Sequence, residues 1–381
     1  MRIAVLTTDN RDPFHEYDKP EPWFGTAIEA LLQGFAMLDE AEVHVVSCVR
    51  HPVRARERLA ANIFFHSLTV PKAGWMTTGY QGCIRAVRSF LKNKIRPEIV
   101  HGQGTERDCA LEAVFSGFPN VLTIHGNMRL IKELLQPPAF SYNWLNAYLE
   151  AFTIPRSDGV VCITRYTQAA VRGLARRTWV LPNAVDARFY AIERRPAAPP
   201  LVLVVGHVCA RKNQNDFIRA LDPLSATRKF TVRFIGLASG RDAYTEEFHA
   251  LLATRLWCQH VHWADRDALR GHFAEATLLA LPSLEDNCPM VVLEAAAAGL
   301  PVIAAKVGGV PDLLEEGVTG LLFDPHDSES MRAAVARMLD DPARADAMAV
   351  TAKERALVRF HPRVVAEKHL EIYREVHKTR A

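Results

Sequence analysis

Short apolar segments alternate with longer amphipathic segments along the whole chain. The apolar segments are nearly continuous, as at 201–206 (LVLVVG) and 277–283 (TLLALPS). Strands of this kind, separated by helices of ten or more residues, are typical of parallel sheets covered on both faces. The sequence therefore predicts an α/β protein. Strands are expected at 2–8, 42–49, 63–70, 98–104, 120–126, 159–165, 178–184, 201–206, 231–238, 260–265, 277–283, 300–306 and 320–324.

The predicted strands form two sets, so we expect two doubly wound domains. A chain of 381 residues is too long for a single core. Residues 186–200, between the sets, are charged and then proline-rich, which indicates a linker. The segment after 330 has a helical pattern interrupted by Pro342 and Pro362.

The composition excludes several classes of protein. With 49% hydrophobic and 23% charged residues the chain reads as an ordinary globular protein, and a net charge of +3 argues against a nucleic-acid binder. No apolar run reaches the roughly 18 residues of a spanning helix, and the start, MRIAVLTTDNRDP, does not resemble a signal peptide. We therefore expect a cytoplasmic protein. Its seven cysteines show no CxxC pair, which argues against a disulfide frame or a zinc site.

Ligands of open parallel sheets bind beyond the carboxyl ends of the strands, so the cleft between the two domains is the expected site. The stretch 281–312 leaves a strand, passes Glu285 and Asp286, and continues into an alanine-rich helix closed by Gly299. Glu294 falls in the second turn of this helix. Its carboxylate could accept both hydroxyls of a ribose, or it could face solvent. Glu285 and Asp286 could contact a ligand or be plain loop acids.

Two other strand exits carry polar side chains. Arg211 and Lys212 follow the strand at 201–206 and precede a helix, where two cations could neutralise a diphosphate. The alternative is a solvated pair of cations. His125 ends the strand at 120–126, where it could face the cleft or be a satisfied structural histidine.

Glycines mark two further positions. Gly308 and Gly309 follow a strand, where paired glycines let the backbone approach a ligand, and Asp312 could accept a sugar hydroxyl or complement a helix dipole. Gly25 begins the first long helix after a polar loop at 9–24, and its amide could touch a phosphate. No GxGxxG fingerprint follows a strand, which weighs against a nicotinamide or flavin enzyme.

These motifs resemble those of the retaining glycosyltransferases of family 4 (group 1), which have the GT-B fold. The run LPSLEDNCPMVVLEAAAAGLPVIAAKVGGVPDLLEEGVTGLLFDPHD is similar to their nucleotide-sugar signature, VVGHVCARKNQ to their diphosphate loop and TIHGN to their histidine motif. The resemblance implies two Rossmann-like domains facing a central cleft. It places an acceptor-binding domain at 1–185 plus 360–381, because the last helix returns to it, and a nucleotide-sugar domain at 201–359.

The resemblance also assigns roles to residues. It implies that Glu294 binds the ribose diol, that Lys212 binds the diphosphate, and that Asp286 holds sugar hydroxyls with Glu285 one residue earlier. His125 would contact the donor sugar and Gly25 the distal phosphate. The chain departs from the family pattern in three places: His207 replaces an arginine whose charge Arg211 could supply, Asp286-Asn287-Cys288-Pro289 replaces a glycine-rich loop, and Asp312 replaces a glutamate beside Gly308 and Gly309.

The resulting hypothesis is transfer of a hexosyl unit from a UDP- or GDP-sugar to a saccharide or lipid-linked acceptor in bacterial-type glycan synthesis. Because no Asp-x-Asp motif is suitably placed, we expect no metal and no cofactor. The alternatives are a nucleotide-sugar epimerase, a phosphorylase of the same fold, or a sugar-nucleotide-binding protein that has lost activity.

Residues 50–96 carry ten Lys or Arg against one acid. They could contact the inner face of a membrane or form a solvated helix face.

Overall fold

The computed structural model describes residues 1–240 and 242–380, and the chain divides into two compact units. Unit 1 comprises Met1–Ala184 and the segment from His361 onward, and unit 2 comprises Val185–Phe360. Residues 186–200, the predicted linker, fall within unit 2, although most side chains of 191–199 are exposed. Within it Phe189 is fully buried, and the amides of Arg195 and Ala197 donate to Ala274 O and Glu275 O.

Unit 1 is built on an eight-stranded sheet in the order β3-β4-β2-β1-β5-β6-β7-β8. Its pairs are parallel except for β3 with β4, a short edge pairing that the sequence did not predict. The strands are β1 (Arg2–Leu6), β2 (Glu42–Val49), β3 (Arg58–Ala60), β4 (Ile63–Thr69), β5 (Ile99–Gln103), β6 (Asn120–Ile124), β7 (Val160–Cys162) and β8 (Thr178–Val180). The helices are α1 (Thr26–Phe35), α2 (Gln81–Phe90), α3 (Cys109–Phe115), α4 (Met128–Leu135), α5 (Tyr142–Thr153), α6 (Arg165–Ala170) and α14 (Pro362–Arg380).

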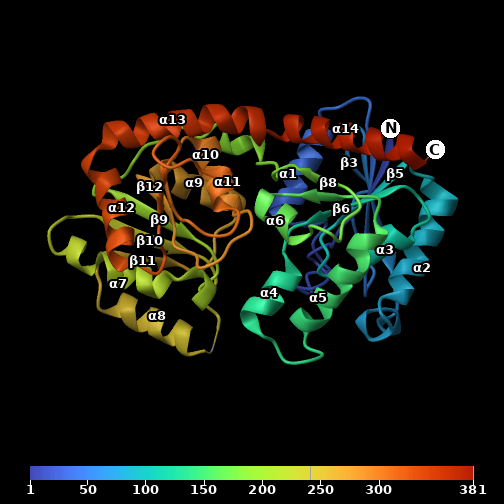
Figure 1. Cartoon of the computed structure of the whole chain (residues 1–381), viewed down its shortest axis with the longest axis horizontal. Coiled ribbons are helices and arrows are strands. Elements are labelled where there is room, and N and C mark those ends of the chain that lie inside the picture. Colours follow the sequence, from blue (N-terminus) through green and yellow to red (C-terminus); the bar gives the residue numbers. More distant parts are fainter. Residues whose placement is uncertain (241, 381) are drawn as a thin grey trace. The chain divides into compact units, whose positions relative to one another are not determined.

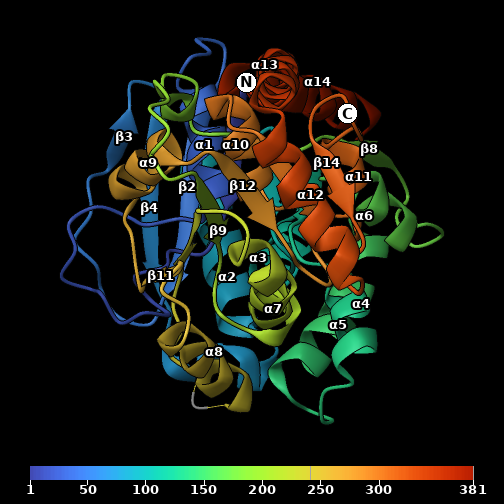
Figure 2. The same ribbon diagram turned by 90° about the vertical axis from the view of Figure 1, so that its left-hand side faces the viewer.

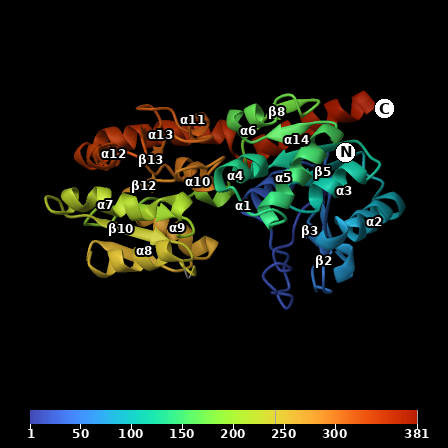
Figure 3. The same cartoon turned by 60° about the horizontal axis from the view of Figure 1, so that its bottom comes forward.

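Side chains of β1 alternate between two apolar cores, as the period of a strand requires. Ile3 and Val5 join the core that contains residues of α1 and α14. Ala4 and Leu6 join the opposite core, which is closed by α2 and α3. These last two helices lie next to each other in Figure 3. Both faces of the sheet are therefore covered, as predicted.

Helix α14 returns to unit 1 and packs along α1 (Figure 1). The approach is close at Gly34, where a Cβ atom would lie 2.1 Å from the carbonyl oxygen of Pro362. Only a residue without a side chain fits there. From the same helix, the Tyr373 hydroxyl lies 2.5 Å from Nδ1 of His101 in β5. The expectation that the C-terminal helix joins the N-terminal domain is confirmed.

Unit 2 contains a six-stranded parallel sheet in the order β11-β10-β9-β12-β13-β14. Helices α7 and α12 lie side by side on one face (Figure 2) and close a core with Val202 and Val204 of β9. The strands are β9 (Leu201–Val205), β10 (Thr231–Ile235), β11 (Cys258–Val261), β12 (Leu278–Leu281), β13 (Val302–Ala305) and β14 (Leu321–Phe323). The helices are α7 (Gln214–Ser225), α8 (Ala243–Ala253), α9 (Arg266–Glu275), α10 (Met290–Ala298), α11 (Val310–Leu313), α12 (Ser328–Asp340) and α13 (Pro342–Arg359).

The basic region at 50–96 contains α2, whose amphipathic pattern is explained by packing. Its apolar residues Cys83, Ile84 and Val87 are buried in the core of unit 1, whereas Arg85 and Arg88 are exposed. No apolar face is left on this helix for insertion into a bilayer. Across residues 1–240 and 242–380, none of the helices combines the length and apolar character needed to cross a membrane.

Candidate active site

Four of the predicted site residues meet in unit 2. Lys212, at the end of the turn Ala210–Lys212 after β9, lies 2.5 Å from the carboxylate of Asp286 (Nζ to Oδ2). Nη1 of Arg211 lies 3.8 Å from the same carboxylate and 3.7 Å from that of Glu285. Because β9 and β12 are neighbours in a parallel sheet, their carboxyl ends bring the loops after them together.

The charges in this cluster balance each other. Arg211 also donates to the carbonyl oxygen of Glu285 at 2.8 Å, and the hydroxyl of Ser283 donates to Asp286 at 3.4 Å. Burial raises the pKa of Glu285, and Arg211 partly offsets this shift. Arg211 and Lys212 are therefore both fixed by carboxylates, with Lys212 largely buried and Arg211 partly exposed to solvent.

The paired glycines support the acid loop. Gly308 has φ of +51°, and a Cβ atom there would lie 2.1 Å from the carbonyl oxygen of Asp286. The amide of Gly309 donates to that same oxygen at 3.0 Å. The loop that carries Asp286 therefore accounts for the close backbone approach at Gly308, which the sequence attributed to a ligand.

Three other predicted residues also belong to unit 2. Asn287 is buried next to Asp286. His207 has an exposed side chain, and its carbonyl oxygen accepts from Gln214 at 2.9 Å. Asp312, in contrast, lines a cavity of about 210 Å³ whose walls do not include Arg211, Lys212 or Asp286. The structure therefore does not place Asp312 in the same pocket as the charge cluster.

Glu294 is buried, with 2% of its surface exposed, and it already has a cationic partner. Nη1 of Arg266 donates to its carboxylate at 2.7 Å. Burial raises the pKa of Glu294, and Arg266 acts against this shift by favouring the charged form. Arg266 also lies 3.8 Å from Asp186 and over the ring of Phe189. Exposure to bulk solvent is excluded for Glu294, but the sequence did not reveal its arginine.

In unit 1, His125 follows β6. Its Nε2 lies 2.9 Å from Oε1 of Gln103, and because an amide oxygen only accepts, Nε2 carries the proton. Burial, followed by the neighbouring His369, lowers the pKa of His125 to about 4. The imidazole is therefore neutral at physiological pH. Gln103, His125 and His369 line one small cavity in unit 1.

The turn that carries His125 is fixed by two glutamates that the sequence did not reveal. Glu106 accepts from the amide of Gly126 at 2.9 Å. Glu150, which is buried, accepts from the amides of Met128 and Arg129 at the start of α4. The Glu150 carboxylate thereby satisfies amides that α4 leaves unpaired at its N-terminus. Glu150 lies on α5, 25 residues from His125, so no local pattern could have identified it.

Gly25 precedes α1 in unit 1, as predicted. Its φ of −70° is ordinary for any residue, and a Cβ atom there would meet nothing within 4 Å. The conformation of the backbone therefore does not require a glycine at this position. A role in contacting phosphate stays a prediction.

Comparisons with known proteins agree with this architecture. Residues 25–189 match the family model described as Glycosyltransferase Family 4, and residues 199–341 match Glycosyl transferases group 1. A glycogen synthase of Mycobacterium tuberculosis is 29% identical over 297 residues, which cover 73% of this chain and 69% of the relative.

Solved structures show the same fold. Sucrose-phosphate synthase from Thermosynechococcus elongatus aligns over 100% of both chains with a TM-score of 0.78 and 18% identity. Anabaena HepE in complex with UDP-glucose aligns over 98% of this chain and 100% of its own, with a TM-score of 0.73 and 18% identity. The chain therefore belongs to the group 1, family 4 glycosyltransferases and has their GT-B fold.

Proposed function

We propose that this glycosyltransferase moves a hexosyl unit from a nucleoside-diphosphate sugar to a saccharide or lipid-linked acceptor, with retention at the anomeric carbon. The observation that carries the proposal is the cluster of Arg211, Lys212 and Asp286 at the carboxyl ends of β9 and β12. A diphosphate needs two or more cationic donors. This cluster supplies them at the carboxyl end of the sheet.

In the proposed reaction, the bond between the anomeric carbon and the diphosphate oxygen breaks, and its electron pair leaves with the diphosphate. Lys212 and Arg211 stabilise the charge that develops on the leaving group. The acceptor oxygen attacks from the face that the diphosphate leaves, and the acceptor hydroxyl passes its proton to the departing diphosphate oxygen. Asp286 and Glu285 are held by the two cations, so we give them the role of binding sugar hydroxyls rather than that of a nucleophile.

The direct test replaces Lys212 by methionine, which keeps the stem of the side chain and removes its charge. We expect kcat/KM to fall about 100-fold, the size expected for one charge-assisted bond made to the leaving group. Arg228→Met is the matched control, because Arg228 pairs with Asp340 on the surface of unit 2. A Lys212 variant within about threefold of wild type would contradict the role in diphosphate binding.

The donor is proposed to be a UDP- or GDP-sugar, in line with the UDP-glucose bound to Anabaena HepE. A thermal-shift comparison of UDP-glucose, UDP-N-acetylglucosamine and GDP-mannose identifies it, since a bound donor raises the melting temperature by mass action. Product analysis with and without acceptor then separates transfer from epimerisation. Donor binding without any turnover would instead indicate a protein that has lost activity.

We also propose that the transfer needs neither a cofactor nor a catalytic metal, because Arg211 and Lys212 supply positive charge where a metal would act. Omitting Mg²⁺ and Mn²⁺ from the assay should leave the rate unchanged.

We propose that any contact of residues 50–96 with a membrane is electrostatic, because the apolar side chains of α2 are buried in the core. Sedimentation with anionic, but not zwitterionic, vesicles would support it.

A further inference from the structure

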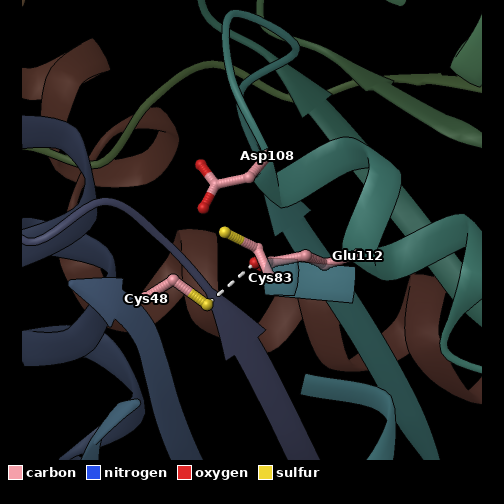
Figure 4. A group of neighbouring side chains, drawn as sticks. All are labelled: Cys48, Cys83, Asp108 and Glu112. Atoms are coloured by element: carbon pink, nitrogen blue, oxygen red, sulfur yellow. Dashed lines mark hydrogen bonds between the residues drawn. The ribbon is translucent and has the colours of Figure 1, made fainter. Parts of the chain in front are cut away.

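Four side chains that carry metal-binding atoms meet in the core of unit 1. Cys48 lies on β2, Cys83 on α2, and Asp108 and Glu112 at the start of α3. One sulfur or carboxylate oxygen from each residue lies within 4.8 Å of those of the other three. Figure 4 shows the four side chains pointing toward a common centre, with the Cys48 thiol donating to Glu112 at 3.1 Å.

The surroundings make this cluster unusual. Each of the four residues is at most 6% exposed, and the core around them is formed by apolar residues such as Val46, Val87 and Leu111. Two carboxylates in such a place are costly unless a cation balances them. Arg107 lies 4.0 Å from Asp108, but it also lies 3.9 Å from Asp12. One shared arginine does not balance two buried acids.

The chemistry of the donor atoms selects the ion. Thiolates favour zinc over magnesium or calcium, and zinc also accepts carboxylate oxygens in a tetrahedral site. Ordinary Zn–S and Zn–O bonds place ligand atoms about 3.3–3.8 Å apart, so the cluster needs to contract by only about 1 Å. Asp108 and Glu112 are four residues apart and therefore share one face at the start of α3.

We propose that Cys48, Cys83, Asp108 and Glu112 bind one zinc ion. The site would be structural rather than catalytic. It would hold α2 and α3 against β2 and would fix the position of the Asp108 carboxylate relative to the Arg107 guanidinium. Four protein ligands close a tetrahedral site and leave no open position for a substrate. The proposal is independent of the reaction at the donor site.

Without zinc, the cluster would be a neutral group of hydrogen-bonded thiols and carboxylic acids. Burial raises the pKa of Asp108 and of Glu112, as that state requires. The two states differ in metal content and in the number of protons released. Zinc would displace the protons of both thiols and any on the acids into solvent.

The first measurement is elemental analysis of the full chain, purified from zinc-supplemented medium and dialysed. We expect about one zinc per chain in wild type, and less than about one tenth in Cys48→Ala and Cys83→Ala. Cys162→Ala is the matched control, since Cys162 is buried in β7 within a different core. It should keep its zinc. Metal retained in both cluster variants, or absent from folded wild type, would overturn the proposal.

A second measurement covers the case in which the cluster variants do not fold. Chelator treatment of wild type should lower the melting temperature, and Zn²⁺, but not Mg²⁺, should restore it. Co²⁺ added to the stripped protein should give a thiolate-to-metal charge-transfer band. No shift and no band would establish the neutral hydrogen-bonded state. A Cys48–Cys83 cross-linked peptide in a non-reducing digest would instead identify a disulfide between these two cysteines and would also overturn the zinc site.

Discussion

Glu294 is bound to a cation before any nucleotide arrives. Its carboxylate is paired with Arg266 at 2.7 Å inside unit 2, whereas Arg266 keeps part of its surface in solvent. If Glu294 binds a ribose diol, it has to use its second oxygen or release the arginine. In that case the pair would link the stability of unit 2 to its affinity for nucleotide.

Replacing Arg266 by methionine should destabilise the protein by about 1–3 kcal/mol, because it leaves a buried carboxylate without its partner. The effect should be partly reversed in the double variant Arg266→Met/Glu294→Gln, which removes the orphaned charge. Urea unfolding measures both. Arg270→Met is the control, since its partner Asp267 is largely exposed. An additive double variant would show that the pair is not coupled.

Several residues of the site were predictable because they follow strands. Arg211 and Lys212 follow β9, whereas Glu285 and Asp286 follow β12. Because the carboxyl ends of neighbouring parallel strands lie at the same end of the sheet, these four residues come together. Arg266 and Gln103 were missed for the opposite reason. Each acts through a contact with a residue more than twenty positions away, at Glu294 and His125. Such pairs depend on how helices and strands pack, which no local spacing encodes.

At the scale of elements, the start of α4 depends on α5. Glu150 accepts two amide hydrogens of α4 and one hydrogen from Thr105. It therefore ties together the strand exits that carry Gln103 and His125. The orientation of His125 should follow the charge state of this carboxylate.

Glu150→Gln should destabilise the protein by about 1–3 kcal/mol, because an amide replaces one of the two acceptor oxygens with a donor that faces N–H groups. If His125 contacts the donor sugar, kcat should fall as well. Glu133→Gln on the surface of α4 is the control. Circular dichroism and steady-state rates measure the two effects, and unchanged values for Glu150→Gln would exclude a role in holding the turn.

Proline and glycine predicted the ends of elements well. α13 begins at Pro342, α14 begins at Pro362, and α10 ends at Gly299 in the left-handed conformation. The edge strand β3 and the backbone contacts of segment 186–200 were missed. Their composition is polar or proline-rich, and their structure comes from contacts with β4 and α9 rather than from local propensity.

At the scale of the whole molecule, buried histidines make stability depend on pH. His369 on α14 is buried, and burial lowers its pKa to about 4. Its ring lies 5.4 Å from that of His101, whose pKa is also lowered by burial. Below pH 6.5 the unfolded chain binds protons that the folded chain does not. Each such histidine therefore lowers the free energy of unfolding as the pH falls from 6.5 toward 4.

His369→Gln removes one of these titrations. Relative to wild type, the variant should gain about 2 kcal/mol of unfolding free energy when the pH is lowered from 7 to 5. Buried acids such as Glu294 shift in the opposite direction, but they are common to both proteins and cancel in the comparison. Urea unfolding at the two pH values measures the difference. A pH-independent difference would show that His369 is protonated to the same extent in both states.

The return of α14 also sets the order in which the molecule can be completed. Unit 1 is assembled from both ends of the chain, and all of unit 2 lies between them. At about 5–20 residues per second, a ribosome needs roughly 10–35 s to pass from Ala184 to His361. During that time the nascent first sheet and α1 lack their covering helix, while unit 2 emerges as one continuous stretch. Unit 2 can therefore fold before unit 1 is complete. Until α14 is synthesised, chaperones would bind the uncovered apolar face of α1.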